Sequence, residues 1–253
     1  MTDSIGSVSH ESNALIFFAD IIDSSKHCTV LGILKYAKKI REFQALFQNL
    51  ANKYFSEEET STSYSAVRSR GDEGTIFCVN STNWHPGDLV YRSVKFAYEL
   101  KGRMRLLSAE KSPRPMDIGV GIHFGPVAVI SRLRKTDEGR PLSVISGIEG
   151  FSINYAKRVE SSSRIGKYSK IFLSKEAAHL LDGDPVVLTK QAVSMKGFND
   201  AEDVFEVRSV FFDNFPEDTE GVDYQRFISQ FSTQHDPIEL ARNPWIKAVI
   251  LSV

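Results

Sequence analysis

The chain has 253 residues, of which 42% are hydrophobic and 25% are charged, and its formal net charge is −1. Such a composition is that of an ordinary globular protein long enough to bury a full core. The near-neutral balance argues against a broad surface for duplex nucleic acid. Only Cys28 and Cys78 occur, without CxxC spacing, so neither a disulfide framework nor a structural zinc site is indicated.

Apolar runs are all short. None approaches the roughly 20 residues needed to span a bilayer, and the first residues lack a signal-peptide pattern. We therefore expect a cytoplasmic protein without a membrane segment. Residues 1–12 are expected to be a flexible N-terminus, residues 13–210 one main domain, and the acidic, irregular stretch 211–253 a C-terminal appendage.

The first third of the chain predicts a strand, a helix and a hairpin. Residues 14–19 (ALIFFA) are continuously apolar, which indicates a central strand covered on both faces. From Val30 to Phe55 apolar residues recur at three- and four-residue steps, which predicts one long amphipathic helix. The segments SYSAVRS and GTIFCV flank residues 71–74 (GDEG), a turn signal between two strands.

The next elements complete an alternating pattern. Residues 88–108 predict a second amphipathic helix, and MDIGVGIHFG and PVAVISRL predict two strands that meet at Gly125-Pro126. A protruding hairpin (RKTDEGRPL), a helix (FSINYAKRVESSSR) and three late strands (IFLS, VVLT, DVFEVR) follow. The order βαββαβ predicts an α+β fold with a ferredoxin-like palm, extended by C-terminal strands, a helix and a tail.

Two acidic residues stand where extended segments end. Asp20 closes the first strand and Asp72 lies in the hairpin turn. Two carboxylates projecting from neighbouring strand ends suit a divalent cation, although a single aspartate at a strand end is more often simply solvated. Asp23 is interpreted as the N-cap of a helix that starts at Ser24 rather than as a third ligand.

Around these aspartates the chain resembles the class III nucleotidyl cyclases. FADIID is similar to the family's F-x-D-I-x-G-F-like start, and RGDEG to its I-G-D hairpin. The resemblance implies that Asp20 and Asp72 bind two divalent cations, Mn²⁺ or Mg²⁺, and that Ile21 donates a main-chain carbonyl. The same two segments also resemble diguanylate cyclases, whose hairpin carries G-G-D-E-F.

The second half of the chain favours class III. GVGIHFGPVAV is similar to the segment G-I-H-x-G-x-V, and INYAKRVES to the helix V-N-x-A-x-R-x-E. This implies that Asn154 orients the ribose and that Arg158 stabilises the pentavalent phosphate. Their four-residue spacing places both on one helix face. In the family these residues complete the metal site of the other subunit, so a homodimer with two interfacial sites is implied.

Further positions are less decisive. Lys196, in VSMKGFND, matches a family lysine that binds the triphosphate, but a surface lysine in a turn is nearly as good an interpretation. His123 lies in an apolar strand and is interpreted as a packed histidine. Gly119 departs from the family, which has an arginine there.

The positions that read the base also depart from the family. Arg68 and Gly147 stand where adenylate cyclases have Lys with Asp or Thr and guanylate cyclases typically have Glu at the first. Arginine only donates hydrogen bonds, and uracil offers two carbonyls. Guanine O6 and N7 could also accept from it.

This combination resembles the pyrimidine cyclases of bacterial anti-phage defence. It implies conversion of UTP to 3',5'-cyclic UMP and pyrophosphate, with the product read by a separate effector. The alternatives are an adenylate, guanylate or cytidylate cyclase, and a catalytically silent nucleotide-binding dimerisation module.

Overall fold

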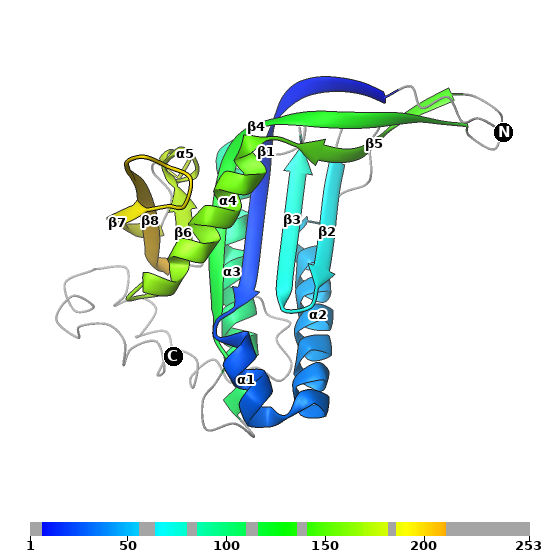
Figure 1. Cartoon of the computed structure of the whole chain (residues 1–253). Coiled ribbons are helices and arrows are strands. Elements are labelled where there is room, and N and C mark those ends of the chain that lie inside the picture. The colour runs from blue at the N-terminus through cyan, green and yellow to red at the C-terminus, as the bar shows by residue number, and fades with distance from the viewer. Residues whose placement is uncertain are drawn as a thin grey trace, which may run out of the picture.

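The computed structural model describes residues 7–55, 64–79, 85–109, 116–135, 141–181 and 186–210. Within them one mixed sheet carries helices on both faces (Figure 1). The strands are β1 (Ser7–Ile21), β2 (Tyr64–Arg70), β3 (Glu73–Val79), β4 (Ile118–Lys135), β5 (Pro141–Glu149), β6 (Ile171–Ser174), β7 (Val186–Ser194) and β8 (Ala201–Val210). The helices are α1 (Ser24–Leu31), α2 (Ile33–Phe55), α3 (Pro86–Ala109), α4 (Phe151–Ser162), the 3₁₀ turn η1 (Ser163–Ile165) and α5 (Lys175–His179).

The strand order confirms the predicted palm. Along the sheet the strands run β2-β3-β1-β4-β6-β8-β7, with β5 paired to β4 off this path. In the predicted βαββαβ unit the sheet order is thus second, third, first and fourth strand, because β4 is its fourth strand and lies antiparallel beside β1. Strand β6 lies beyond this unit, parallel to β4. The extra strands β7 and β8 extend one edge. The C-terminal appendage predicted at 211–253 lies outside the described residues.

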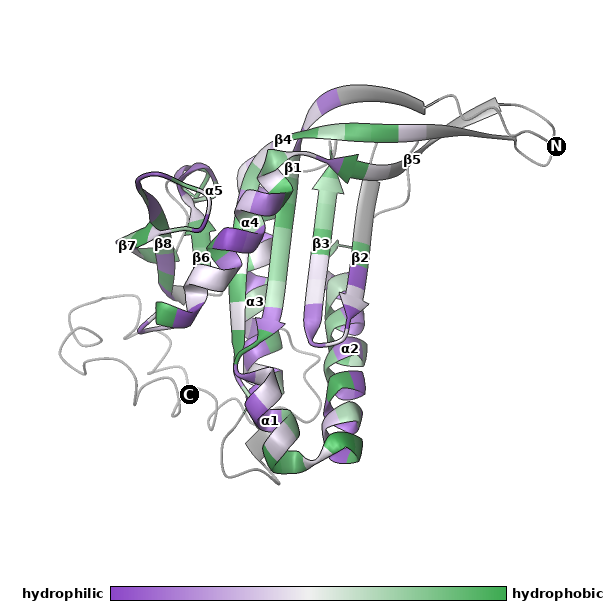
Figure 2. Ribbon diagram, in the orientation of Figure 1, coloured by the Kyte–Doolittle hydropathy of each residue, from purple (hydrophilic) through white to green (hydrophobic). Residues whose placement is uncertain are grey.

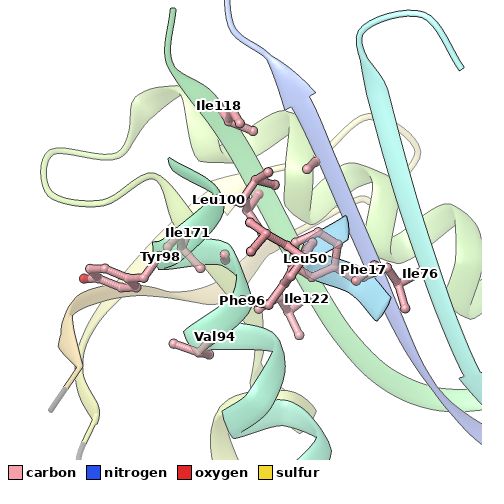
Figure 3. Close-up of a cluster of buried hydrophobic side chains, with 14 of the residues drawn as sticks. Phe17, Leu50, Ile76, Val94, Phe96, Tyr98, Leu100, Ile118, Ile122 and Ile171 are labelled. Carbon is pink, nitrogen blue, oxygen red and sulfur yellow. The ribbon is translucent and has the colours of Figure 1, made fainter. Parts of the chain in front are cut away.

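Strand β1 is the centre of the molecule because it is apolar on both faces. Leu15, Phe17 and Ala19 pack with α2 and α3, while Ile16 and Phe18 pack on the opposite face, beneath α4. In the first layer, Phe17 and Ile76 of the sheet meet Leu50 of α2 and Phe96 of α3 (Figure 3). The prediction of a strand covered on both faces is confirmed, and this packing fixes where the strand ends.

The long helix predicted from Val30 to Phe55 is wrong at its start. The chain breaks at Gly32, whose positive φ of 77° suits glycine, and α1 forms a separate helix before α2 begins. None of the residues of α1 is buried, and Leu34 at the start of α2 is 86% exposed. The apolar spacing therefore continued across a corner of the chain, and periodicity alone does not reveal such a break.

The two strands predicted to meet at Gly125-Pro126 are one continuous strand. In β4, Gly125 and Pro126 lie opposite Ala14 and Asn13, within an unbroken antiparallel ladder with β1. β1 itself begins at Ser7, well before the apolar run that predicted it. The two strands form a long ribbon that β5 joins (Figure 1). The tip of the predicted hairpin lies outside the described residues.

His123 is a packed histidine, as predicted. Its side chain is 5% exposed, Nδ1 lies 2.8 Å from Ser174 Oγ, and its ring meets Tyr155 edge-on. A hydrogen bond from His123 lowers the pKa of Glu176 to about 2, despite an opposing effect of burial. These contacts tie β4 to α4 and α5 without pointing to a catalytic role.

Close approach of α4 to β4 depends on glycine. A Cβ added to Gly121 would lie 2.6 Å from Glu160 Cα, whereas a Cβ on Gly147 would meet no described atom within 4 Å. We expect Gly121→Ala to lower the free energy of unfolding by ~1–3 kcal/mol, because the helix must move off the sheet. Gly147→Ala, the matched control, should change it by less than about 0.5 kcal/mol. Chemical denaturation measures both, and equal values would contradict the packing described.

Candidate active site

The two predicted metal aspartates lie together at one end of the sheet. Asp20 ends β1 opposite Glu73, and Asp72 occupies the turn that joins β2 to β3. The Ile21 amide donates to the Asp72 carbonyl oxygen at 3.2 Å, which joins the two segments directly. The turn is held from behind by Gln44 of α2, whose amide donates to the Gly71 carbonyl at 3.0 Å. The sequence prediction that these two acids lie near each other is confirmed.

Hydropathy changes along these strands. The apolar colouring of β1 and β3 gives way to hydrophilic colouring toward the ends that carry the aspartates, and the end of β2 is hydrophilic as well (Figure 2). The side chain of Asp20 is only 16% exposed. The site is thus a polar edge directly beyond the apolar half of β1, residues 14–19, and a partly desolvated carboxylate can be held there in one position.

The pKa of Asp20 reflects this crowding. Burial raises it above its ordinary value, Lys157 lowers it, Asp72 raises it further, Arg164 lowers it and Glu73 raises it. The net direction is upward. An ionised carboxylate that is disfavoured by burial and by a second acid is stabilised by a cation, so the electrostatics of this edge fit a divalent ion.

The donor set fits as well. Two carboxylates and the nearby main-chain carbonyl of Ile21 are oxygen donors of the kind that Mg²⁺ and Mn²⁺ take. In the described part of the chain, no three acidic, histidine or cysteine side chains converge into a metal-binding group. The remaining coordination positions would therefore belong to substrate phosphates and water, the usual arrangement for Mg²⁺ in phosphate chemistry.

Two basic side chains that the sequence analysis missed neutralise this edge. Lys157 Nζ lies 2.5 Å from Glu73 Oε2 and 2.8 Å from Glu160 Oε2, and Arg164 Nη2 lies 3.1 Å from Asp20 Oδ2. Burial raises the pKa of Glu160, an effect that Lys157 opposes. Lys157 is adjacent in sequence to Arg158, and Glu73 to Asp72, so the predicted site residues point to both of them. Arg164 lies in the polar stretch SSSRIG, where no motif distinguishes it.

Asp23 occupies the N-cap position of α1 but does not cap it in the predicted way. Its φ is 56°, its side chain makes no capping hydrogen bond to the helix backbone, and its carboxylate instead lies 3.0 Å from Nζ of Lys26 within the same helix. The left-handed backbone turns the chain sharply after the strand. The position was predicted correctly and the capping contact was not.

Asn154 and Arg158 lie on the opposite side of α4 from the sheet. The buried residues of α4 face β1, β4 and β6, namely Ser152, Tyr155, Ala156, Val159 and Glu160. Asn154 is exposed and Arg158 is half-buried. Among the described residues, no hydrogen bond or ion pair engages either side-chain head group. Their predicted shared face is confirmed, and within one chain that face is turned away from the surface that packs over the aspartates.

The remaining positions singled out from the sequence lie on β2, β4, β5 and the turn after β7. Arg68 is exposed on β2 opposite Thr75, and Lys196 is exposed in the turn that follows β7. Gly147 lies in β5 opposite Ile130, with no described atom within 4 Å of the place a Cβ would take. Gly119 packs where a Cβ would strike Ser163 Oγ, so a side chain such as the arginine of the family pattern would require that hydroxyl to move.

Comparison with known proteins supports the fold. No family model and no curated protein matches the chain. The adenylyl cyclase CyaB from P. aeruginosa matches with a TM-score of 0.64 and 18% identity, covering 82% of this chain and 100% of that one. The guanylate cyclase domain of RhGC from Catenaria anguillulae, solved with GTP, matches with a TM-score of 0.57 and 18% identity, covering 80% and 100%.

A third match is a monomeric crystal structure of the guanylyl cyclase domain of the RhoGC fusion protein from Blastocladiella emersonii. Its TM-score is 0.52 at 16% identity, covering 80% of this chain and 99% of that one. No helix in the described ranges is both long and apolar enough to cross a membrane. At these identities the likeness concerns architecture, and the chain has the mixed α+β fold of the catalytic domains of adenylyl and guanylyl cyclases.

Proposed function

We propose that the protein is a nucleotidyl cyclase that converts a nucleoside triphosphate into a 3',5'-cyclic mononucleotide and pyrophosphate. The observation that carries this proposal is the proximity of Asp20 and Asp72 at the strand ends of a cyclase-type sheet, where the Ile21 amide donates to the Asp72 carbonyl. In the reaction the ribose 3'-oxygen bonds to the α-phosphorus. The bond from that phosphorus to the bridging oxygen breaks, and the hydroxyl proton is released.

Each group has a chemical role in that reaction. Two divalent cations at Asp20, Asp72 and the Ile21 carbonyl would lower the pKa of the 3'-hydroxyl and bind the triphosphate. The Asn154 amide is a neutral donor for the ribose, and the Arg158 guanidinium stabilises charge that spreads over the phosphoryl oxygens. Lys196 supplies a cation for the outer phosphates.

The site is proposed to be shared between two subunits. Asn154 and Arg158 present donors on the outward face of α4 that no described side chain engages, while the aspartates of the same chain lie at the strand ends. A head-to-tail homodimer would bring the outward face of one chain to the aspartates of the other, twice over. One of the matching structures is monomeric, so dimer formation by this protein needs its own test. Light scattering with and without nucleotide measures the oligomeric state in solution.

The substrate is proposed to be UTP. Arg68 donates to acceptors only, which suits the two carbonyls of uracil, and it is exposed on β2. At Gly147 no side chain offers an acceptor to an adenine amine, and the space around it is open among the described residues. At these two positions the chain resembles the anti-phage pyrimidine cyclases. On that resemblance, we propose that the product, cyclic UMP, acts as a second messenger for a separate effector.

A product assay tests the reaction and the base together. The protein is incubated with each of the four NTPs and Mn²⁺, and the products are identified by mass spectrometry. Cyclic UMP with pyrophosphate supports the proposal. Another cyclic mononucleotide would replace UTP as substrate, a cyclic dinucleotide would indicate diguanylate-type chemistry, and tight binding without product would indicate the silent module.

A variant of Arg68 tests how the base is read. We expect Arg68→Ala to raise the KM for UTP about tenfold or more, because a bidentate contact to a base contributes ~1–3 kcal/mol to discrimination. The kcat should change little, since Arg68 does not touch the reacting atoms. Steady-state kinetics with UTP and the next-best NTP provides the internal control. An equal rise in KM for both would assign Arg68 to the phosphates instead.

A further inference from the structure

The acidic edge is only partly neutralised by the protein itself. Four carboxylates gather there, from Asp20, Asp72, Glu73 and Glu160, and two cations from Lys157 and Arg164 oppose them. If all six groups are ionised, two negative charges remain. One divalent cation would balance that excess, and a second would arrive with the four negative charges of a triphosphate.

The two cations are not equivalent. Lys157 bonds to Glu73 and Glu160, neither of which is a proposed metal ligand, and its side chain is 34% exposed with its ammonium group over the Phe18 ring. The charge of Lys157 also acts on Asp20, but its described ion pairs occupy no oxygen of that carboxylate. Lys157 can therefore remain in place throughout and anchor α4 to the turn that carries Asp72.

Arg164 is placed differently. It follows α4 in η1, its side chain is 51% exposed, and its guanidinium contacts Oδ2 of Asp20, an oxygen of the proposed metal ligand itself. Its charge also acts on the carboxylates of Asp23 and Glu160. A metal ion bound to Asp20 would feel direct repulsion from this guanidinium, and the two would compete for the same oxygen.

We infer that Arg164 is an internal counter-ion of Asp20 that competes with the divalent cation, and so sets how tightly the nucleotide-free protein holds metal. This inference rests on the metal assignment of the proposed function. Arg164 is a positioning residue here, because it acts through Asp20 and not on the substrate. Half of its side chain is exposed, and among the described residues its one ion pair is that of Nη2 with Asp20, so the side chain can move away when a metal ion arrives.

The test is the affinity for Mn²⁺ without nucleotide, measured by electron paramagnetic resonance of the free ion. We expect Arg164→Gln to tighten binding about three- to tenfold, a range that allows for solvent screening of a half-exposed group. Arg164→Lys keeps the charge and should stay within about twofold of the wild type. The gain in Arg164→Gln should shrink as salt rises.

Lys190→Gln is the matched control. It removes the same charge from another exposed ion pair, that of Lys190 with Asp203 at 2.7 Å on β7 and β8. It should leave Mn²⁺ affinity unchanged. Unaltered or weaker binding in Arg164→Gln would overturn the inference. So would an equal gain in Lys190→Gln, a gain in Arg164→Lys as large as in Arg164→Gln, or no measurable Mn²⁺ binding by either the wild type or Arg164→Gln.

This measurement is independent of the proposed reaction. Mn²⁺ binding that depends on Asp20 and tightens in Arg164→Gln, without any cyclic product, would refute the proposed function and leave the counter-ion intact. Formation of a cyclic product, together with an unchanged Mn²⁺ affinity in Arg164→Gln, would support the proposed function and refute the counter-ion role of Arg164. Thermal melting of each variant without metal checks that the fold is unchanged.

Discussion

Replacing Asp20 by Asn should lower the rate of cyclic nucleotide formation by about 10³-fold or more, because the metal ions are expected to supply several kcal/mol of transition-state stabilisation. The same substitution should make the metal-free protein more resistant to heat at neutral pH. The folded pKa of Asp20 is raised, so ionising this carboxyl costs stability, and the loss develops as pH rises through its titration. Asparagine removes that cost.

Three measurements check this expectation. Product formation gives the rate, melting without metal gives the stability, and melting with Mn²⁺ gives the metal-induced gain, which should disappear. Asp23→Asn is the matched control, since Asp23 lies three residues away, is exposed and pairs with Lys26. Its turnover and metal-induced gain should stay near those of the wild type. Turnover above about a tenth of the wild-type rate in Asp20→Asn would refute the metal assignment.

The second expected result concerns the two faces of α4. Arg158→Ala should lower kcat by about 10²- to 10³-fold, the usual effect of deleting one donor to a transition-state charge. Stability should change little, since no described residue pairs with the guanidinium. A mixture of the Arg158→Ala and Asp20→Asn proteins should regain up to about a quarter of wild-type activity. Half of randomly formed dimers contain one chain of each variant, and each such dimer holds one intact site of two.

The control for this experiment is a mixture of Asp20→Asn with Asp72→Asn. Both substitutions damage the metal half of the site, so neither site of a mixed dimer is intact and no activity should return. Subunit exchange is verified by mass spectrometry of differently labelled chains. Absence of recovery in verified Asp20→Asn and Arg158→Ala dimers would mean that the site is not shared in this way.

Local patterns were sufficient for part of the fold. The run ALIFFA predicted the central strand because both of its faces are apolar. Gly71-Asp72 predicted the turn because glycine tolerates a positive φ and aspartate favours tight turns. The spacing of Asn154 and Arg158 predicted their common face. The break at Gly32 and the continuity of β4 through Gly125-Pro126 were missed, because the same residues are compatible with a corner or with a strand.

The order of elements, and the two aspartates, the amide and the guanidinium proposed for the site, were thus predicted from the sequence itself, since each prediction depends on residues close together in the chain. Only the tertiary structure decided which charges neutralise them. Lys157 meets Glu73 across 84 positions and Arg164 meets Asp20 across 144. Those pairs exist because glycines in β4 let α4 pack directly on the sheet, and a contact made by packing leaves no local pattern in the chain.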